Sequence, residues 1–262
     1  MELVDLLIYN YTVVFIFGAM IGSFLNVCIH RLPREQSIVT PPSNCPKCKN
    51  HIRCYDNIPI LSYILLGGKC RFCKASISVR YPFIEFLTGF FATLLFFRFG
   101  LTADLFIYFI FLASLIVITF IDLDERIIPN EISIPGIGVG LLSSLFLSDL
   151  TFRDSFIGAI VGGGILITVA FAYHLVTKRE GMGGGDIKLL AMIGAFLGWK
   201  GALVTLFLGS FVGAFTGIFF MIREGKDTKY AVPFGPFLAI GAFIYLFFGN
   251  DIVRWYISFN KW

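Results

Sequence analysis

Charged residues are scarce in this sequence. Asp, Glu, Lys and Arg make up 15% of the 262 residues, whereas hydrophobic residues make up 57% and the mean hydropathy is +0.83. A soluble domain carries about 25% charged residues, so this composition excludes an ordinary soluble protein. Apolar runs of about 17–25 residues recur along the chain, and a helix of this length crosses the hydrocarbon core of a bilayer.

The pattern predicts an all-α polytopic membrane protein with about eight transmembrane helices. The expected spans are residues 11–29, 82–98, 103–121, 132–148, 155–177, 187–199, 201–222 and 231–249. The chain opens with MELVD and lacks the basic start of a cleaved signal peptide. We therefore expect the first span to be retained.

Lys and Arg are unevenly distributed between the segments that join these spans. With the N-terminus outside, sixteen of the 21 fall on the inner side of the membrane and five on the outer side, namely Arg98, Arg153, Lys200, Arg254 and Lys261. Loops rich in Lys and Arg face the cytoplasm. The formal net charge of +4 is thus explained by membrane topology and requires no nucleic-acid partner.

One long polar loop, residues 30–81, lies between the first two spans on the inner side. Its two C-x-x-C pairs, CPKC and CRFC, have 21 residues between them and contribute Cys45, Cys48, Cys70 and Cys73. This spacing predicts one tetrahedral structural zinc site with four cysteine ligands. Disulfides or a redox-active pair are alternatives, although a reducing inner side disfavours structural disulfides. A loop this short needs such a staple, so we expect a zinc-binding subdomain at 30–81.

Four further side chains are weaker candidates. Cys28 lies inside the first span and is expected to be a small packing residue. Cys54 is either a spare metal ligand or has no role, and His51 is a weak alternative ligand. Glu85 lies inside an apolar span, where it is a functional candidate or rests at the membrane interface.

Two aspartates are expected to meet at the inner face. Asp122 follows the apolar run LIVITFI, and Asp186 begins the sixth span directly after Gly183, Gly184 and Gly185. Two carboxylates that share a site hold one proton between them. One can then act as general base on a water molecule and the other as acid toward a carbonyl oxygen. The glycines permit unusual backbone angles and the close approach of an extended substrate.

Other interpretations of these residues stay open. Asp186 could cap a helix N-terminus, and Asp122 could be an interfacial residue at the end of a span. Lys188 could stabilise charge near Asp186 or serve as an ordinary basic anchor. The pair could also couple ions in a transporter, although no inverted repeat is evident. A non-enzymatic, zinc-bearing assembly protein that docks through residues 30–81 is a further alternative.

Five segments of the sequence resemble the prepilin peptidases, which are membrane aspartic proteases of the GxGD type. The segments are GSFLNVCIHRLP (Gly22–Pro33), the cysteine loop Cys45–Glu85, FIDLDERIIPNEISIP (Phe120–Pro135), EGMGGGDIKLLAMIGAFLGW (180–199) and VPFGPFLAIG (232–241). The family's two aspartates match Asp122 and Asp186, and its G-x-G-D motif matches Gly183 to Asp186. Cys54 departs from the family, which often has Trp there.

The resemblance implies a bifunctional enzyme in the bacterial cytoplasmic membrane, with its active site facing the cytoplasm. Such an enzyme cleaves the leader of type IV prepilins or pseudopilins after a glycine. It then methylates the new N-terminal amine with S-adenosylmethionine. The implied division of the chain is a first span at 1–29, the zinc loop at 30–81 and a peptidase membrane domain at 82–262.

Methylation rests on the resemblance alone. S-adenosylmethionine commonly meets a glycine-rich loop after a strand, and no such unit is visible. The residues of its site therefore stay unknown, and a peptidase without methyltransferase activity is the alternative. The oligomeric state is not predicted.

Overall fold

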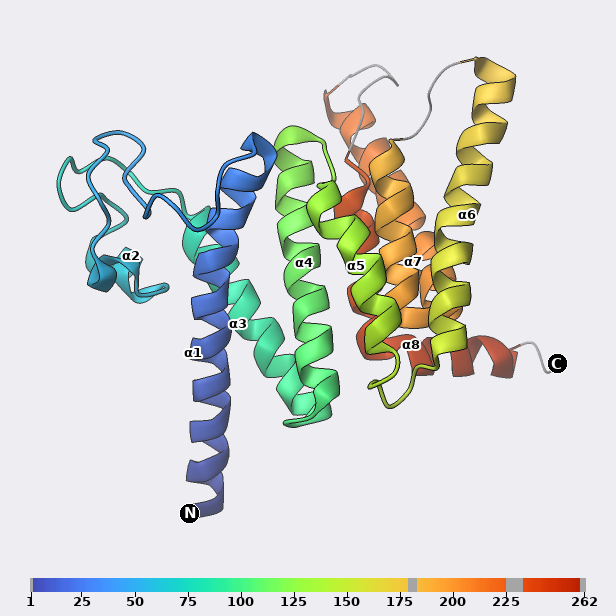
Figure 1. The fold of residues 1–262 in the computed structure, drawn as a ribbon, viewed down its shortest axis with the longest axis horizontal. Coiled ribbons are helices and arrows are strands. Elements are labelled where there is room, and N and C mark those ends of the chain that lie inside the picture. Colours follow the sequence, from blue (N-terminus) through green and yellow to red (C-terminus); the bar gives the residue numbers. More distant parts are fainter. Residues whose placement is uncertain (1, 179–182, 225–232, 260–262) are drawn as a thin grey trace. The chain divides into compact units, whose positions relative to one another are not determined.

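The computed structural model describes residues 2–178, 183–224 and 233–259, and these are helical wherever they are regular. They contain no strand, only two isolated β-bridges. The elements are α1 (Glu2–Arg31), the 3-10 helices η1 (Leu32–Arg34) and η2 (Cys54–Asn57), α2 (Leu61–Leu65), α3 (Arg80–Phe99), α4 (Ala103–Glu125), α5 (Asn130–Ser143), α6 (Phe152–Thr177), α7 (Gly184–Glu224) and α8 (Gly235–Phe259) (Figure 1). The predicted all-α class is confirmed. Four residues of the charge count, Arg179, Lys226, Lys229 and Lys261, lie outside the described residues.

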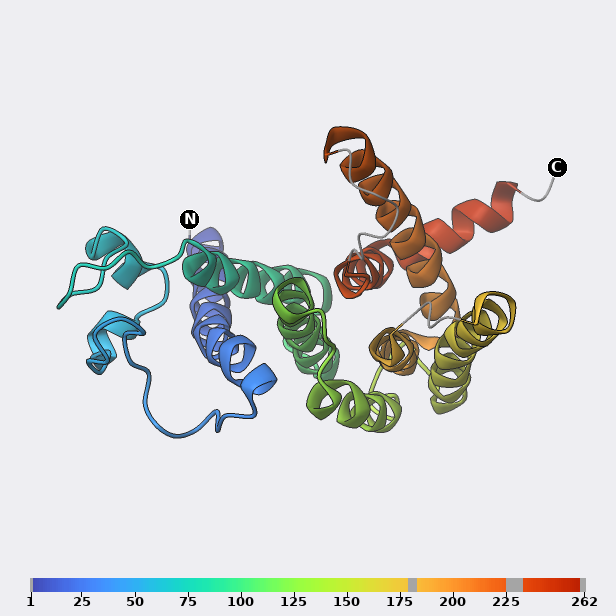
Figure 2. The same cartoon turned by 90° about the horizontal axis from the view of Figure 1, so that it is seen from above.

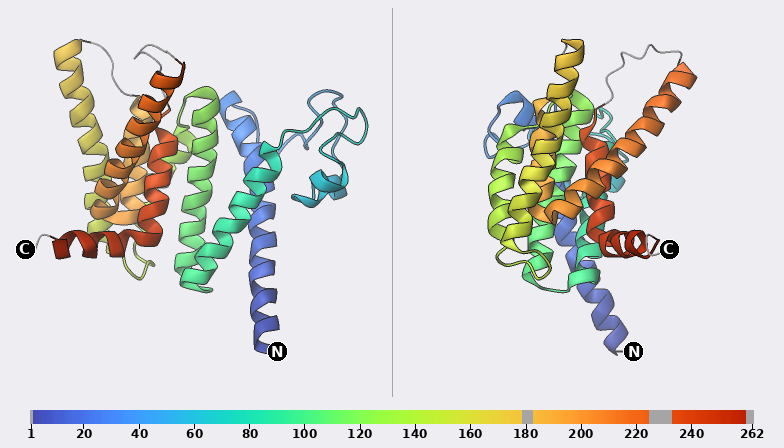
Figure 3. Two further views of the ribbon diagram at one scale, coloured as in Figure 1. Left: turned by 180° about the vertical axis from the view of Figure 1, so that it is seen from behind. Right: turned by 90° about the vertical axis from the view of Figure 1, so that its right-hand side faces the viewer.

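Five of these helices are long and apolar enough to cross a membrane: α1, α3, α4, α6 and α7. The chain is thus a multi-pass membrane protein, while the predicted number of eight spans stays a prediction. The sixth and seventh predicted spans both lie in α7, which is interrupted at Gly198 (φ 73°, ψ 177°). Only glycine adopts such angles readily. Beyond this kink, α7 diverges from α6 (Figures 2 and 3).

The chain divides into two compact units, Met1–Val117 and Ile118–Trp262. In the first unit, α1 and α3 run antiparallel side by side, joined by the cysteine loop (Figures 1 and 3). Glycine permits their close approach, because a Cβ on Gly22 would lie 2.7 Å from the Cα of Glu85. Small residues at a helix contact are typical of membrane bundles. Residue 85 is thereby held directly against α1.

In the second unit, the first half of α7 forms the core with α5 and α6 packed against it, and α8 packs against the second half, for example at Thr205 and Gly209. Its fully buried side chains include Leu189, Leu190, Met192 and Ile193. Gly158 of α6 lies against Gly194 of α7 so closely that neither position has room for a Cβ. This backbone contact fixes α7, and with it the position of Asp186 at the start of the helix.

Candidate active site

The two predicted aspartates come together in the second unit. Asp122 lies in the last turn of α4 and is 5% exposed, and Asp186 is the third residue of α7 and is half-buried. Their carboxylates are near enough for their charges to interact. Because a buried pair of like charges is costly, the arrangement favours one proton shared between them.

The segments that carry the two aspartates also touch each other. A Cβ on Gly185 would lie 2.8 Å from the Cβ of Ile128, so glycine lets the loop after α4 pack on the start of α7. Lys188 of α7 donates a hydrogen bond through Nζ to Oδ1 of Asn130, the first residue of α5. These contacts hold the ends of α4 and α7 together.

A third element reaches Asp122. The backbone N–H of Gly235, the first residue of α8, donates to Oδ2 of Asp122 at 2.9 Å. The first N–H groups of a helix have no partner within it and carry partial positive charge, so a carboxylate is a favourable acceptor there. This oxygen is consequently fixed in place. The sequence gives one signal for this residue, a glycine between two prolines in VPFGPF.

From the sequence-based prediction that Asp122 is catalytic, Gly235→Ala is expected to slow the reaction strongly, because the added Cβ would lie 2.6 Å from Oδ2 of Asp122 and would displace the carboxylate. A small misplacement of a catalytic group can cost about 100-fold in rate. We expect kcat to fall by about that factor with little change in KM. Gly217→Ala is the matched control, since open space surrounds that position. Equal kcat values for the two variants would show that the contact with Gly235 does not matter.

The three glycines before Asp186 divide into two kinds. Gly183 and Gly184 are exposed. A Cβ added at Gly183 would lie 3.8 Å from Oδ2 of Asp186 and 4.0 Å from the backbone N of Gly185, and no other described atom would lie within 4 Å. Gly185 is instead a packing residue. The side of Asp186 that faces Gly183 is therefore unobstructed among the described residues, as a site for an extended chain requires. Asp186 is the third residue of α7, so it does not occupy the N-cap position.

The four predicted cysteines form one cluster in the first unit. The sulfur atoms of Cys45, Cys48, Cys70 and Cys73 lie within 4.8 Å of one another, and the Cys45–Cys73 and Cys48–Cys70 separations are 3.8 and 4.0 Å. Zinc–sulfur bonds of about 2.3 Å in a tetrahedron place the sulfurs about 3.8 Å apart. The donor set fits a tetrahedral metal ion. Neither His51 nor Cys54 belongs to this cluster.

The two C-x-x-C segments have the same local structure. The N–H of Cys45 bonds to the Asn50 carbonyl, as that of Cys70 does to Ala75, and Lys49 and Lys74 occupy equivalent positions with φ of 60° and 57°. The backbone N–H of Cys48 is the main cause that lowers the pKa of Cys45 to about 6. A thiol with a lowered pKa is more readily the thiolate that binds metal. Each segment thus forms a knuckle that presents two cysteine sulfurs.

Other predicted residues are placed as follows. Cys28 is buried, which confirms its packing role.

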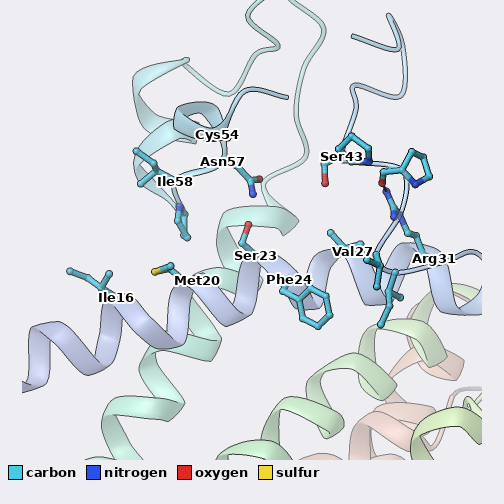
Figure 4. Close-up of a pocket in the computed structure, with 15 residues that line it drawn as sticks. Ile16, Met20, Ser23, Phe24, Val27, Arg31, Ser43, Cys54, Asn57 and Ile58 are labelled. Atoms are coloured by element: carbon cyan, nitrogen blue, oxygen red, sulfur yellow. Dashed lines mark hydrogen bonds between the residues drawn. The ribbon is translucent and has the colours of Figure 1, made fainter. Parts of the chain in front are cut away.

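A cavity of about 500 Å³ lies between α1 and the cysteine loop, and Figure 4 shows Cys54, Ser23, Asn57 and Arg31 among its lining residues. Arg31 donates to the carbonyls of Ser37 and Pro41 and so holds the loop against the end of α1.

These features define a class, namely a multi-pass helical membrane protein with a paired-carboxylate site and a four-cysteine cluster. Residues 109–218 match the type IV leader peptidase family, and residues 16–99 match the bacterial peptidase A24 N-terminal domain. The chain belongs to the type IV leader peptidase family.

Full-length relatives agree with this assignment. The chain is 38% identical to a prepilin leader peptidase/N-methyltransferase of Aeromonas salmonicida, over 95% of this chain and 94% of that protein. Identity to the protein of the same name from Pseudomonas aeruginosa is 36%, over 92% and 91% of the two chains. Identity to the Myxococcus xanthus protein of that name is 42%, over 81% of this chain and 63% of that protein. No solved structure matches this chain.

Proposed function

We propose that this protein cleaves the leader peptide of type IV prepilins or pseudopilins and methylates the new N-terminal amine. The observation that carries the peptidase activity is the pairing of Asp122 with Asp186 at the joined ends of α4 and α7. Relatives that match over nearly their whole length carry both activities in their names. The chain is accordingly an aspartic endopeptidase with N-methyltransferase activity.

In the proposed reaction, the scissile peptide lies beside Gly183 and Gly184 and extends over the carboxylate pair. One carboxylate takes a proton from a water molecule, whose oxygen attacks the scissile carbonyl carbon. The other carboxylate donates its proton to the carbonyl oxygen, and the tetrahedral intermediate then collapses with a proton passing to the leaving amine. Water attacks directly, so no acyl-enzyme forms.

Two hydrogen bonds indicate what the residues around the carboxylate pair do. Gly235 holds Oδ2 of Asp122 as an acceptor, so a shared proton resides on another oxygen of the pair. Lys188 is engaged by Asn130, so it serves to join the two segments. Lys188 therefore acts on Asp186 by holding the start of α7 in place, and its positive charge lies two residues from Asp186 in the sequence.

We propose zinc as the ion of the four-cysteine cluster. Four protein thiolates leave no open coordination position, so the ion is structural and takes no part in catalysis. It holds the two knuckles in one fold, which the short loop lacks the core to maintain alone.

The orientation proposed from Lys and Arg counts puts the N-terminus outside and the aspartates at the cytoplasmic face of a bacterial inner membrane. A prepilin that anchors in this membrane through an apolar helix would present its leader at that face. The expected partners are thus prepilins or pseudopilins and the lipid bilayer.

S-adenosylmethionine is the proposed methyl donor, and it supplies a methyl group bonded to a positively charged sulfur. We place it in the 500 Å³ cavity of the first unit, whose volume is typical of small-molecule sites. The guanidinium of Arg31 suits the donor's carboxylate, and Ser43 and Asn57 offer hydrogen-bonding groups to its hydroxyls.

Ser43→Phe is expected to fill this cavity and to abolish methylation while leader cleavage continues, because the aspartates lie in the other unit. Equilibrium dialysis with radiolabelled S-adenosylmethionine measures donor binding directly. Ser76→Phe, at an exposed position in the second knuckle, serves as the control. Undiminished donor binding by Ser43→Phe would exclude the cavity and leave the peptidase assignment untouched.

The combined function is tested with the purified protein in lipid vesicles, a prepilin and methyl-labelled S-adenosylmethionine. We expect release of the leader and transfer of label to the mature chain. An ion-coupled transporter would instead show aspartate-dependent ion flux, and an assembly protein would bind the prepilin without cutting it.

A further inference from the structure

The cysteine loop also carries an apolar segment, residues 58–66. Ile58 and Pro59 line the proposed donor cavity, whereas the rest of the segment has no part in the proposed reactions. Within it, α2 exposes 49% of Leu61, 66% of Ile64 and 75% of Leu65. Single exposed apolar side chains are ordinary on a protein surface, but a cluster on so short a helix marks a contact with something apolar.

A hydrogen bond to a membrane helix gives the depth of this segment. The N–H of Ile60 donates to Oε2 of Glu85 at 2.7 Å, and Glu85 also bonds to the side chain of Ser23. Glu85 lies five residues into α3 from Arg80, and Ser23 lies eight residues before the end of α1 at Arg31. At 1.5 Å per residue, these positions are about 7.5 and about 12 Å inside the helix ends.

The arginines at the two helix ends give a reference for this depth. The core of a bilayer is about 30 Å thick, and basic residues such as Arg31 and Arg80 mark its edge. The bond from Ile60 therefore holds residue 60 at the level of Glu85, further into the helices than these basic residues.

The cavity agrees with this depth. Ile58 and Pro59 line it together with Ile16 and Met20 of α1, which lie still further from Arg31 (Figure 4). Figure 1 likewise draws α2 below the level at which α1 ends. The apolar segment thus returns from the loop toward the middle of its neighbouring span.

We propose that residues 58–66 are a re-entrant segment, with Leu61, Ile64 and Leu65 in contact with lipid acyl chains. The occupant is lipid because these exposed apolar side chains do not line the donor cavity and belong to a segment that a hydrogen bond ties to Glu85, inside a helix long and apolar enough to cross a membrane. The cysteine loop, which the sequence places on the inner side of the membrane, is then partly embedded in the bilayer.

The same proposal accounts for Glu85, an acid within a span. Ile60 has φ 61° and ψ −50°, a conformation that a β-branched residue rarely adopts and in which its N–H lies outside any helix. Non-helical backbone is tolerated at membrane depth only where its polar groups find partners. Glu85 provides that partner, so the carboxylate and the turn depend on each other.

Site-directed spin labelling of the full-length protein in lipid bilayers tests the depth. The background replaces Cys28 and Cys54 by Ala and keeps the four clustered cysteines metal-bound. A nitroxide is placed at Leu65→Cys or, as matched control, at Val39→Cys, which is 80% exposed in the same loop near Arg31. Collisions with oxygen report lipid, and collisions with a water-soluble nickel chelate report solvent.

We expect the label at 65 to collide more with oxygen and the label at 39 more with nickel. Equal access to nickel at both positions would overturn the proposal. Access to neither reagent at 65 would also overturn it, because a protein partner would then cover α2.

Glu85→Ala, introduced into the Leu65→Cys protein, is a second test. It removes the acceptor of the Ile60 N–H, so the label at 65 is expected to move toward water and to gain nickel collisions. A label that keeps its depth in this variant would show that Glu85 does not hold the segment.

Discussion

Asp122→Asn and Asp186→Asn are each expected to stop leader cleavage while the protein still inserts into the membrane. An amide has the shape of the carboxylate but cannot take a proton from water or share one with its neighbour. One positioned acid or base contributes about 10²–10⁴-fold in rate, so each variant should lose at least that factor. The measurement is the rate of leader release from a prepilin by purified protein in lipid vesicles.

The matched control for this loss is Asp124→Asn, because Asp124 is exposed and lies two residues beyond Asp122 on the same helix. It should cleave at the rate of the unaltered protein. If Asp124→Asn lost activity as completely as Asp122→Asn, the effect would come from a general change at the end of α4. Full cleavage by either of the other two variants would remove its aspartate from the mechanism.

Loss of the metal is expected to unfold the cysteine loop. Structural zinc in small zinc-binding peptides contributes an apparent binding free energy of about 10–16 kcal/mol near neutral pH, far more than a loop of this size gains from its own core. Cys48→Ser should consequently lose the ion and expose residues 32–79 to proteolysis. Methylation should be lost with it, since the loop forms one wall of the proposed donor cavity.

Cys54→Ser is the control for that experiment, because Cys54 is exposed and lies outside the four-sulfur cluster. It should retain about one zinc ion per chain by elemental analysis, as a single four-thiolate site requires. A Cys48→Ser protein that kept its metal and its resistance to protease would contradict a zinc site built from these four cysteines.

Much of the helical architecture follows from hydrophobic pattern alone. Each expected span has a helix over most of its length, because apolar runs of this kind have few other structures available in a bilayer. The kink at Gly198 was not predicted: the sequence indicated only that one expected span ends at residue 199 and the next begins at residue 201. Helix-forming residues stand on both sides of Gly198. Its non-helical backbone angles depend on packing, so the sequence pattern does not indicate them.

The cysteine cluster was also predictable, because a C-x-x-C pair brings two sulfurs together by local geometry. The contact of Gly235 with Asp122 was not predicted, although its segment was matched to the family. It joins residues 113 positions apart through a backbone N–H, and no side-chain pattern records such a donor. The depth of α2 escaped prediction for a related reason, since it depends on one hydrogen bond from a polar loop to a buried acid.

The most direct test of the central claim is the N-terminal mass of a type IV prepilin co-expressed with this protein or with its Asp186→Asn variant. We expect the unaltered protein to yield a chain that has lost its leader and gained one methyl group, and the variant to yield the intact prepilin. A leader removed equally well by Asp186→Asn, or retained with the unaltered protein across several classes of pilin, would refute the proposed function.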